Sequence, residues 1–171
     1  KIFISKLFKD KEMEHKQLLT VFNSLPVGIG FFTADGTLVR CNESFCRIFG
    51  ADSQTLLGNK LNINENSVVP DVVKEAVRRC VPVQMSFLYD FDKQRTDKRF
   101  FSTRTRTCYL KCNGNPLYDN DGKFVNYIFI FEDITETVKS EEVLRQSRRK
   151  TELAMKAANI MFWEFDAVPK L

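Results

Sequence analysis

Residues 127–131 read Tyr-Ile-Phe-Ile-Phe, and this run restricts the possible folds of the chain more than any other feature. Side chains alternate between the two faces of a β-strand, so a strand over these residues is apolar on both faces. Such a strand has to be covered from both sides. We therefore expect a sheet with helices packed on one face and another apolar element on the other.

The N-terminal residues supply a candidate for the second covering element. Leu18, Phe22 and Leu25 recur at helical spacing before Pro26, which predicts an amphipathic helix over residues 5–25. This helix is the obvious candidate to lie on the face of the sheet that the other helices leave open.

The apolar stripe of this helix is wider than one sheet face needs, because Leu19 and Val21 extend it. A spare apolar edge favours a partner, and a symmetric pair brings the same patch together about a two-fold axis. We expect a parallel homodimer with Leu18, Phe22 and Leu25 in the interface. The alternative is a monomer whose helix folds wholly onto its own sheet.

Turn and cap residues divide the first half of the chain. Asp35-Gly36 is a strong hairpin signal between two short apolar runs, VGIGFFT and TLVRC. Asn42 is well placed as the N-cap of a short helix that Gly50 closes. A further helix is predicted after Pro70, with an irregular connection over residues 59–66 before it.

In the second half of the chain, the spacing of apolar residues changes to the alternation that is typical of β-strands. Four stretches look like strands, with a hairpin turn at DNDG and a bulge or short loop over residues 92–98; they are VQMSFLYDF, RFFSTRTR, TCYLKCNGNPLY and KFVNYIFIFEDI. A long charged helix is predicted after Thr135, and the chain then repeats the change from helix to apolar strand. We divide it into an N-terminal helix (1–25), a central domain (26–135), a C-terminal helix (136–159) and the first strand of a truncated second copy (160–171).

Four motifs, in order and at the right spacing, resemble the PAS family from about Leu18 to Thr135: PVGIGFFTADG, NESFCRIFG, NPLYDNDGKF and EDIT. The resemblance implies an α+β fold, with a five-stranded antiparallel sheet, short helices on one face and signalling helices at both ends. It also implies a sensory or relay module of a bacterial two-component sensor histidine kinase, with adjacent PAS and kinase modules in the same chain. The alternatives are a small-molecule receptor or a dimerisation spacer, in a cyclic dinucleotide synthase or another signalling protein.

Two candidate sites follow from this resemblance. A ligand cavity between sheet and helices is expected to be lined by Phe45, Phe49, Val77, Met85 and Leu110. The second site is the EDIT junction at Asp133, Ile134 and Thr135, where a helix follows that connects family members to the next signalling unit. The simpler interpretation is that Asp133 and Thr135 only end a strand and start a helix.

No catalytic site and no haem, flavin or metal cofactor is expected, and the ligand is left unknown. Haem-binding members use a His in the helix before the long strands, whereas residues 71–80 contain none and the sole His is His15. The cysteine-containing helix of the flavin photoreceptors is missing too. No phosphate-binding loop appears. Five cysteines without CxxC spacing favour reduced thiols and a cytoplasmic setting.

Charge and hydropathy narrow the range of partners. The net charge of +4 comes from scattered residues, which argues against nucleic-acid binding. The local basic cluster is interpreted as a solvated hairpin because acidic residues interleave with it; its members are Lys93, Arg95, Lys98, Arg99, Arg104 and Arg106. No apolar run reaches the roughly 18 residues of a membrane span, so direct membrane insertion is not expected. Membrane attachment of the parent protein is left open.

Overall fold

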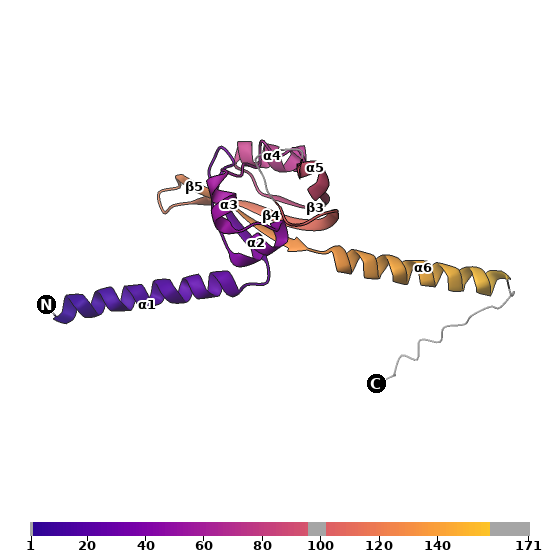
Figure 1. Ribbon diagram of the computed structural model, residues 1–171, viewed down its shortest axis with the longest axis horizontal. Coiled ribbons are helices and arrows are strands. Elements are labelled where there is room, and N and C mark those ends of the chain that lie inside the picture. Colours follow the sequence, from indigo (N-terminus) through magenta and orange to yellow (C-terminus); the bar gives the residue numbers. More distant parts are fainter. Residues whose placement is uncertain (1, 96–101, 158–171) are drawn as a thin grey trace, which may run out of the picture. The chain divides into compact units, whose positions relative to one another are not determined.

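The computed structural model describes residues 2–95 and 102–157 of the chain. It separates into two units, Lys1–Ile134 and Thr135–Leu171. Figure 1 shows the helices and strands in chain order, which are α1 (Ile2–Ser24), β1 (Gly28–Phe32), β2 (Leu38–Cys41), α2 (Glu43–Phe49), α3 (Ser53–Gly58), α4 (Asp71–Arg79), β3 (Val83–Asp90), α5 (Phe91–Arg95), β4 (Thr107–Tyr118), β5 (Phe124–Asp133) and α6 (Thr135–Ala157).

The five strands form one antiparallel sheet in the order β2-β1-β5-β4-β3. The apolar run 127–131 lies in β5, the central strand, and pairs with β1 on one side and β4 on the other. This confirms the α+β fold and the antiparallel sheet that the sequence predicts. The first and last strands are neighbours at the centre, so Gly28 at the start of β1 is opposite Phe131 near the end of β5.

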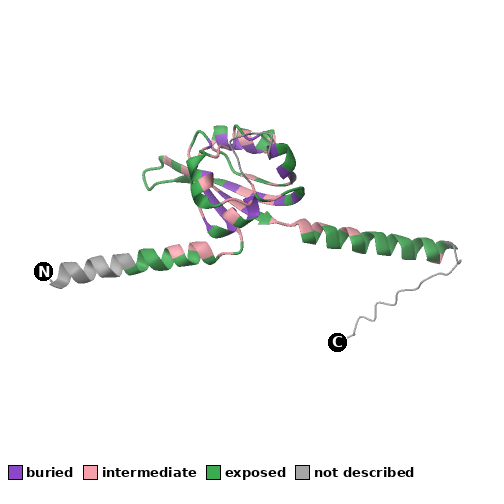
Figure 2. Cartoon of the chain, in the orientation of Figure 1, coloured by how far each residue is buried: buried purple, intermediate pink, exposed green. Residues whose placement is uncertain are grey.

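The inner face of β5 forms part of the core. Tyr127, Phe129 and Phe131 are buried there, and rings from α2 pack against them: Phe45 and Phe49 lie 5.7 and 5.3 Å from Phe131. Figure 2 shows the buried residues gathered in the sheet and in the helices that cover this face. Edge-to-face packing of these rings adds to the stabilisation from burial of apolar surface.

The outer face of the sheet is covered less completely than we expected. Ile128 and Ile130 on this face are half-buried, and Phe22 of α1 lies 6.0 Å from the ring of Phe31 on the same face. Leu18 is 69% exposed and Val21 is 57% exposed. The last turn of α1 therefore contacts the sheet through Phe22, whereas Leu18, one turn earlier, is exposed.

The buried side chain of Asn42 makes hydrogen bonds to four main-chain groups near the start of the domain. Its Oδ1 accepts hydrogen bonds from the N–H groups of Phe45 (2.9 Å) and Ile29 (2.8 Å), and its Nδ2 donates to the carbonyl groups of Phe22 (3.0 Å) and Val27 (2.9 Å). The predicted N-cap is confirmed, and Gly50 ends α2 in the left-handed conformation at φ 64°. One side chain thus joins β1, α2 and the end of α1.

Two local predictions in the second half were wrong. Residues 102–106, the described part of RFFSTRTR, form no strand, because Ser102 and Thr103 bond to the end of α2: Ser102 Oγ donates to Phe49 O and Thr103 N to Gly50 O. A short helix, α5, forms where a bulge or loop was expected. Asp90 starts it by accepting hydrogen bonds from the N–H groups of Asp92 and Lys93.

The second unit contains α6, which begins at Thr135 and is charged along its length, as the sequence predicts. Its residues from Thr135 to Lys156 are half-buried or exposed (Figure 2). Arg145 pairs with Glu142 at 2.9 Å. The predicted strand of a second domain, residues 160–171, lies outside the described residues.

Candidate ligand cavity and signalling junction

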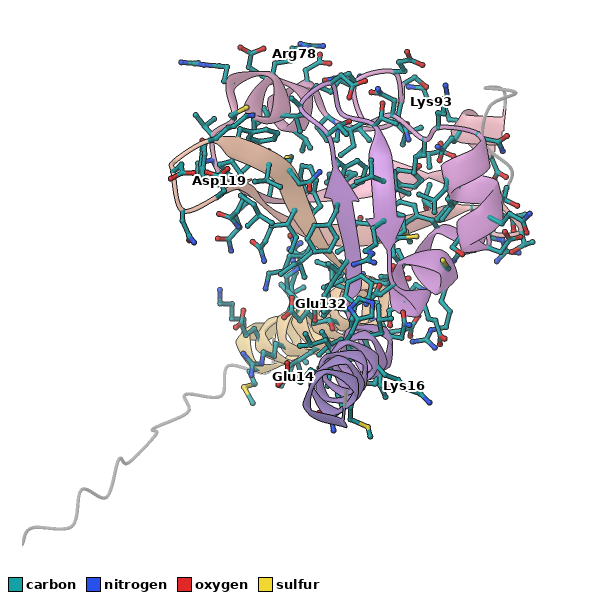
Figure 3. The ribbon with its side chains drawn as sticks, turned by 90° about the vertical axis from the view of Figure 1, so that its left-hand side faces the viewer. Glu14, Lys16, Arg78, Lys93, Asp119 and Glu132 are labelled. Carbon is teal, nitrogen blue, oxygen red and sulfur yellow. The ribbon has the colours of Figure 1, made fainter. Side chains whose placement is uncertain are left out.

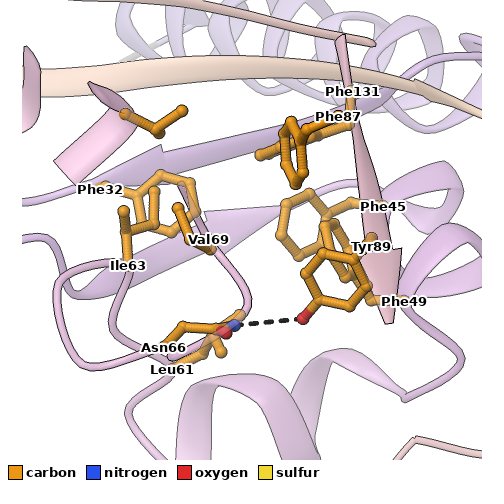
Figure 4. A pocket seen from close by; sticks show the side chains of 11 residues that line it. Phe32, Phe45, Phe49, Leu61, Ile63, Asn66, Val69, Phe87, Tyr89 and Phe131 are labelled. Atoms are coloured by element: carbon orange, nitrogen blue, oxygen red, sulfur yellow. Dashed lines mark hydrogen bonds between the residues drawn. The ribbon is translucent and has the colours of Figure 1, made fainter. Parts of the chain in front are cut away.

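An apolar cavity lies between the inner face of the sheet and the segments that cover it (Figure 4). Side chains from β1, α2, α4, β3, β5 and the connection before α4 line it: Phe32, Phe45, Phe49, Leu61, Ile63, Asn66, Val69, Val73, Phe87, Tyr89 and Phe131. Strand alternation directs the residues of β1, β3 and β5 inward, and helical periodicity directs Phe45 and Phe49 of α2 toward them.

The cavity has a volume of about 20 Å³, which is room for roughly one water-sized molecule. Ligand pockets for small organic molecules usually have volumes of about 300–1,000 Å³. In this conformation the aromatic side chains themselves fill the space between sheet and helices. A metabolite would fit only after these rings or the segment before α4 had moved.

A chain of three buried polar side chains borders the cavity. Asn66 Nδ2 donates to the Tyr89 hydroxyl at 3.1 Å, and that hydroxyl donates to Gln94 Oε1 (Figure 4 shows the first bond). Asn66 Oδ1 accepts a hydrogen bond from the N–H of Val68. Burial raises the pKa of Tyr89, so its hydroxyl is neutral at physiological pH and serves as donor and acceptor.

The predicted cavity residues fall into two groups. Phe45 and Phe49 line the cavity. Val77 and Leu110 are buried in the same core and Met85 packs against it, but all three lie at other places in that core. The lining side chains of β1 and β3 were not predicted, although the alternation of side chains within those two strands would have indicated them.

Arg104 connects the wall of the cavity with the end of the sheet. Its guanidinium donates to Ile48 O at 2.9 Å and to Asp133 Oδ2 at 2.9 Å, and lies 5.4 Å from the centre of the Phe91 ring. The side chains of Arg104 and Asp133 are 36% and 25% exposed, so the pair is partly shielded from water. One cation therefore contacts α2, α5 and the last residue of β5.

This geometry corrects the interpretation of the basic cluster. The sequence predicts a solvated hairpin at Arg104, but its ion pair with Asp133 and its contact with the Phe91 ring place it against the domain. Lys93 is exposed, as predicted, but it lies in the helix α5 and not in a hairpin; Lys98 and Arg99 lie outside the described residues. Figure 3 shows Lys93, Arg78 and Asp119 at the periphery, where charged side chains face away from the core.

The predicted junction residues lie together at the end of β5. Asp133 is the last residue of the strand and holds Arg104; Ile134 N donates to Tyr109 O at 2.9 Å; Thr135 begins α6. Both interpretations of the sequence thus describe the same residues, because a strand ends and a helix starts here. The ion pair to Arg104 is the added feature that the sequence did not reveal.

Titratable groups of the core are kept neutral. Burial raises the pKa of Cys108 and Cys112 to about 11 and that of Tyr127 to about 12. Among residues 2–95 and 102–157, no group of three His, Cys, Asp or Glu side chains lies close enough together to hold a metal ion. His15 is exposed on α1. The absence of haem and flavin stays a prediction.

None of the helices in the described part of the chain is long and apolar enough to cross a membrane.

Comparisons with known proteins agree with this architecture. A family model described as PAS fold matches residues 22–139. The probable diguanylate cyclase DgcE of Escherichia coli (strain K12) is 21% identical over 145 residues, which are 85% of this chain and 13% of that protein. The chain thus spans a small part of the curated relative it matches.

Solved structures with the same fold include the PAS domain of an HTR-like protein from Haloarcula marismortui, with a TM-score of 0.57 and 20% identity over 76% of this chain and 99% of that one. The PAS domain of BvgS from Bordetella pertussis has a TM-score of 0.52 and 17% identity over 81% and 98%. A PAS domain from a two-component sensor histidine kinase has a TM-score of 0.53 and 14% identity over 72% and 98%. At these identities the likeness concerns the fold.

Proposed function

The chain belongs to the PAS family, and on this premise we propose that it is a relay module of a sensor histidine kinase, which regulates an output module through its flanking helices. The contacts of Arg104 carry the proposal. Movement of α2, which forms one wall of the cavity, changes the position of Ile48 O, to which the Arg104 guanidinium donates. The same guanidinium holds Asp133, the last residue of β5, two positions before α6 begins. An event in the core thus has a short physical path to the junction at Asp133, Ile134 and Thr135.

A relay is favoured over a receptor for a large ligand because the cavity in this conformation has room for about one water-sized molecule. A receptor function requires a second, more open conformation of the core. A purely structural spacer permits the partly shielded ion pair of Arg104 with Asp133, and the hydrogen bond of Arg104 to α2, but requires neither of them.

The second candidate for the output is a diguanylate cyclase. The observation that favours it is the similarity to a probable diguanylate cyclase over 85% of this chain. A PAS domain from a sensor histidine kinase has the same fold, which supports the first candidate. In both cases the module precedes or connects to an enzyme and acts through helix packing.

The test is to measure the basal output of the full-length parent protein with Arg104 replaced by Gln. Loss of the Arg104 guanidinium is expected to change the rate of product formation by about fivefold or more, which is the size of a typical allosteric effect. Phosphohistidine formed from ATP identifies a kinase, and cyclic diguanylate formed from GTP identifies a cyclase. Arg79→Gln is the matched control, because Arg79 is exposed on α4. Equal rates for the two variants would refute the relay, and a parent that forms neither product would refute both outputs.

We also propose that α1 forms the interface of a parallel homodimer. Leu18, Val21 and Met13 are 69%, 57% and 61% exposed, which is a cost for apolar side chains unless another surface covers them. Phe22 and Leu25, also predicted at this interface, are half-buried, and Phe22 contacts Phe31 of its own domain. The exposed residues on α1 are therefore the better ones to substitute.

The double variant Leu18→Asp, Val21→Asp is expected to be a folded monomer, while the unchanged chain is a dimer by light scattering at ~100 μM, above the micromolar Kd of a weak specific interface. Gln17→Asp adds a charge at an exposed polar position of the same helix and is expected to leave the dimer intact. An unchanged chain that is monomeric at this concentration contradicts the proposal.

A further inference from the structure

Two cysteine thiols lie next to each other where β2 passes into α2. Cys41 is the last residue of β2 and Cys46 lies within α2, and their Sγ atoms are 3.8 Å apart. A disulfide has an S–S distance of about 2.05 Å, so closing the pair needs a shift of roughly 2 Å, within the reach of side-chain rotation and a small movement of the backbone. Four residues separate the two cysteines in sequence.

Both thiols are reachable from solvent. They line one surface hollow of about 420 Å³ together with Asn23, Asn42, Glu43, Asp52 and Ser53. Cys108 and Cys112 on the inner face of β4, by contrast, are 2% and 0% exposed. A small uncharged oxidant can therefore reach the first pair of thiols, while the second pair is enclosed by the core.

The two thiols differ in their readiness to react. Burial raises the pKa of Cys46, and the carboxylates of Asp52 and Glu43 add to this rise, while the hydrogen bond between the two thiols lowers it. Burial raises the pKa of Cys41 to about 12. Since the thiolate is the nucleophile, Cys46 is the residue that attacks first and Cys41 the one that resolves.

We propose that Cys41 and Cys46 are an oxidative modification site, at which hydrogen peroxide or a related small peroxide converts the two thiols into a reversible intramolecular disulfide. Cys46 sulfur attacks one peroxide oxygen, the O–O bond breaks, and a sulfenic acid and one water form. Cys41 sulfur then attacks the sulfenic sulfur, and the hydroxyl leaves as a second water. Two thiols lose two electrons and two protons, and the peroxide gains both. The site does not depend on the proposed relay function.

The position of the pair determines what the disulfide would change. Asn42 and Ser44 lie between the two cysteines. Asn42 donates to Phe22 O in the last turn of α1, and Ser44 Oγ donates to Leu25 O directly after α1. Drawing Cys41 and Cys46 together displaces the segment that carries these donors. Oxidation is therefore expected to alter the attachment of α1 to the domain.

The chain offers a direct test, because trypsin cleaves after Arg40 and Arg47 and releases Cys41–Arg47 as one peptide with both thiols. After treatment of the folded chain with hydrogen peroxide, this peptide is expected to be lighter by two hydrogens and to resist alkylation. Dithiothreitol is expected to reverse both changes. Hydrogen exchange of the amides in residues 20–27 is expected to change with oxidation and to return on reduction.

Cys80→Ser removes the other half-buried thiol and leaves the site intact, so oxidation of the Cys41–Arg47 peptide is expected to be unchanged in it. Cys46→Ser and Cys41→Ser are each expected to abolish the exchange response in residues 20–27. The urea-unfolded chain, in which all thiols are exposed, shows that the oxidant is active. If the unfolded chain forms the disulfide and the folded chain does not, or if folded chains join through disulfides between molecules instead, the proposal is wrong.

Discussion

Replacing Asn42 with alanine is expected to lower the free energy of unfolding by about 3–5 kcal/mol. The side chain is 1% exposed and makes four hydrogen bonds to main-chain groups of Phe22, Val27, Ile29 and Phe45. Alanine removes the N-cap of α2, worth about 1 kcal/mol. It also leaves main-chain groups without their partner, at about 1–3 kcal/mol for each one that stays buried. Urea unfolding followed by circular dichroism measures the change.

Two further variants separate the causes. Asn42→Asp keeps an oxygen that accepts from Ile29 and Phe45 but loses both donated bonds, so an intermediate loss is expected. Asn115→Ala changes the same residue type at an exposed position of β4 and is expected to shift stability by less than about 0.5 kcal/mol. A loss of under about 1 kcal/mol in Asn42→Ala would contradict the role assigned to this side chain.

Gly114→Val is expected to destabilise the domain by about 3 kcal/mol or to prevent folding, because the inner face of β4 has no room for a side chain there. A Cβ atom at Gly114 would lie 2.7 Å from Tyr127 Cε1 and closer still to the ring of Phe129. Both rings are fully buried and pack against each other at 4.8 Å, so neither can move without displacing other core residues.

Gly58→Ala is the matched control for this prediction. Gly58 ends α3, and no heavy atom lies within 4 Å of an added Cβ. Alanine is the better helix former, so the stability of this variant is expected to be unchanged or higher by up to about 1 kcal/mol. Thermal unfolding of both variants compares the two sites. If the two variants unfolded at nearly the same temperature, the rings of Tyr127 and Phe129 would be able to move aside for a side chain at position 114, and the prediction would be wrong.

The sequence predicts the sheet and the helices well because local patterns determine them. Alternation in the run 127–131 indicates a central strand, Asn42 has the form of an N-cap, and Asp35-Gly36 has the form of a hairpin turn. These signals involve residues a few positions apart. The structure confirms the antiparallel sheet and the capped helix that they predict.

The candidate site was predicted only in part, because its contacts join residues far apart in the sequence. Arg104 lies in a run of basic and polar residues, a pattern typical of a segment exposed to solvent. Its partners Ile48 and Asp133 are distant from it in the chain, one before it and one after it. Asn66 was one asparagine among several in an irregular connection, and its bond to Tyr89 depends on how that connection folds over the core. Cys41 and Cys46 are close in the sequence, but their contact depends on the angle at which β2 passes into α2, which no local pattern specifies.

The pairing of β1 with β5 at the centre of the sheet has a consequence for the speed and order of folding. Gly28 and Phe131 are on the order of a hundred residues apart, so closing this pair has a larger entropic cost than closing the hairpin of β4 and β5. Rates fall as such distant contacts come to dominate a topology. The hairpin is therefore an early event and the docking of β1 onto β5 a late one. In a chain still being synthesised, β1 can pair with β2, but its other edge stays unpaired until β5 has left the ribosome.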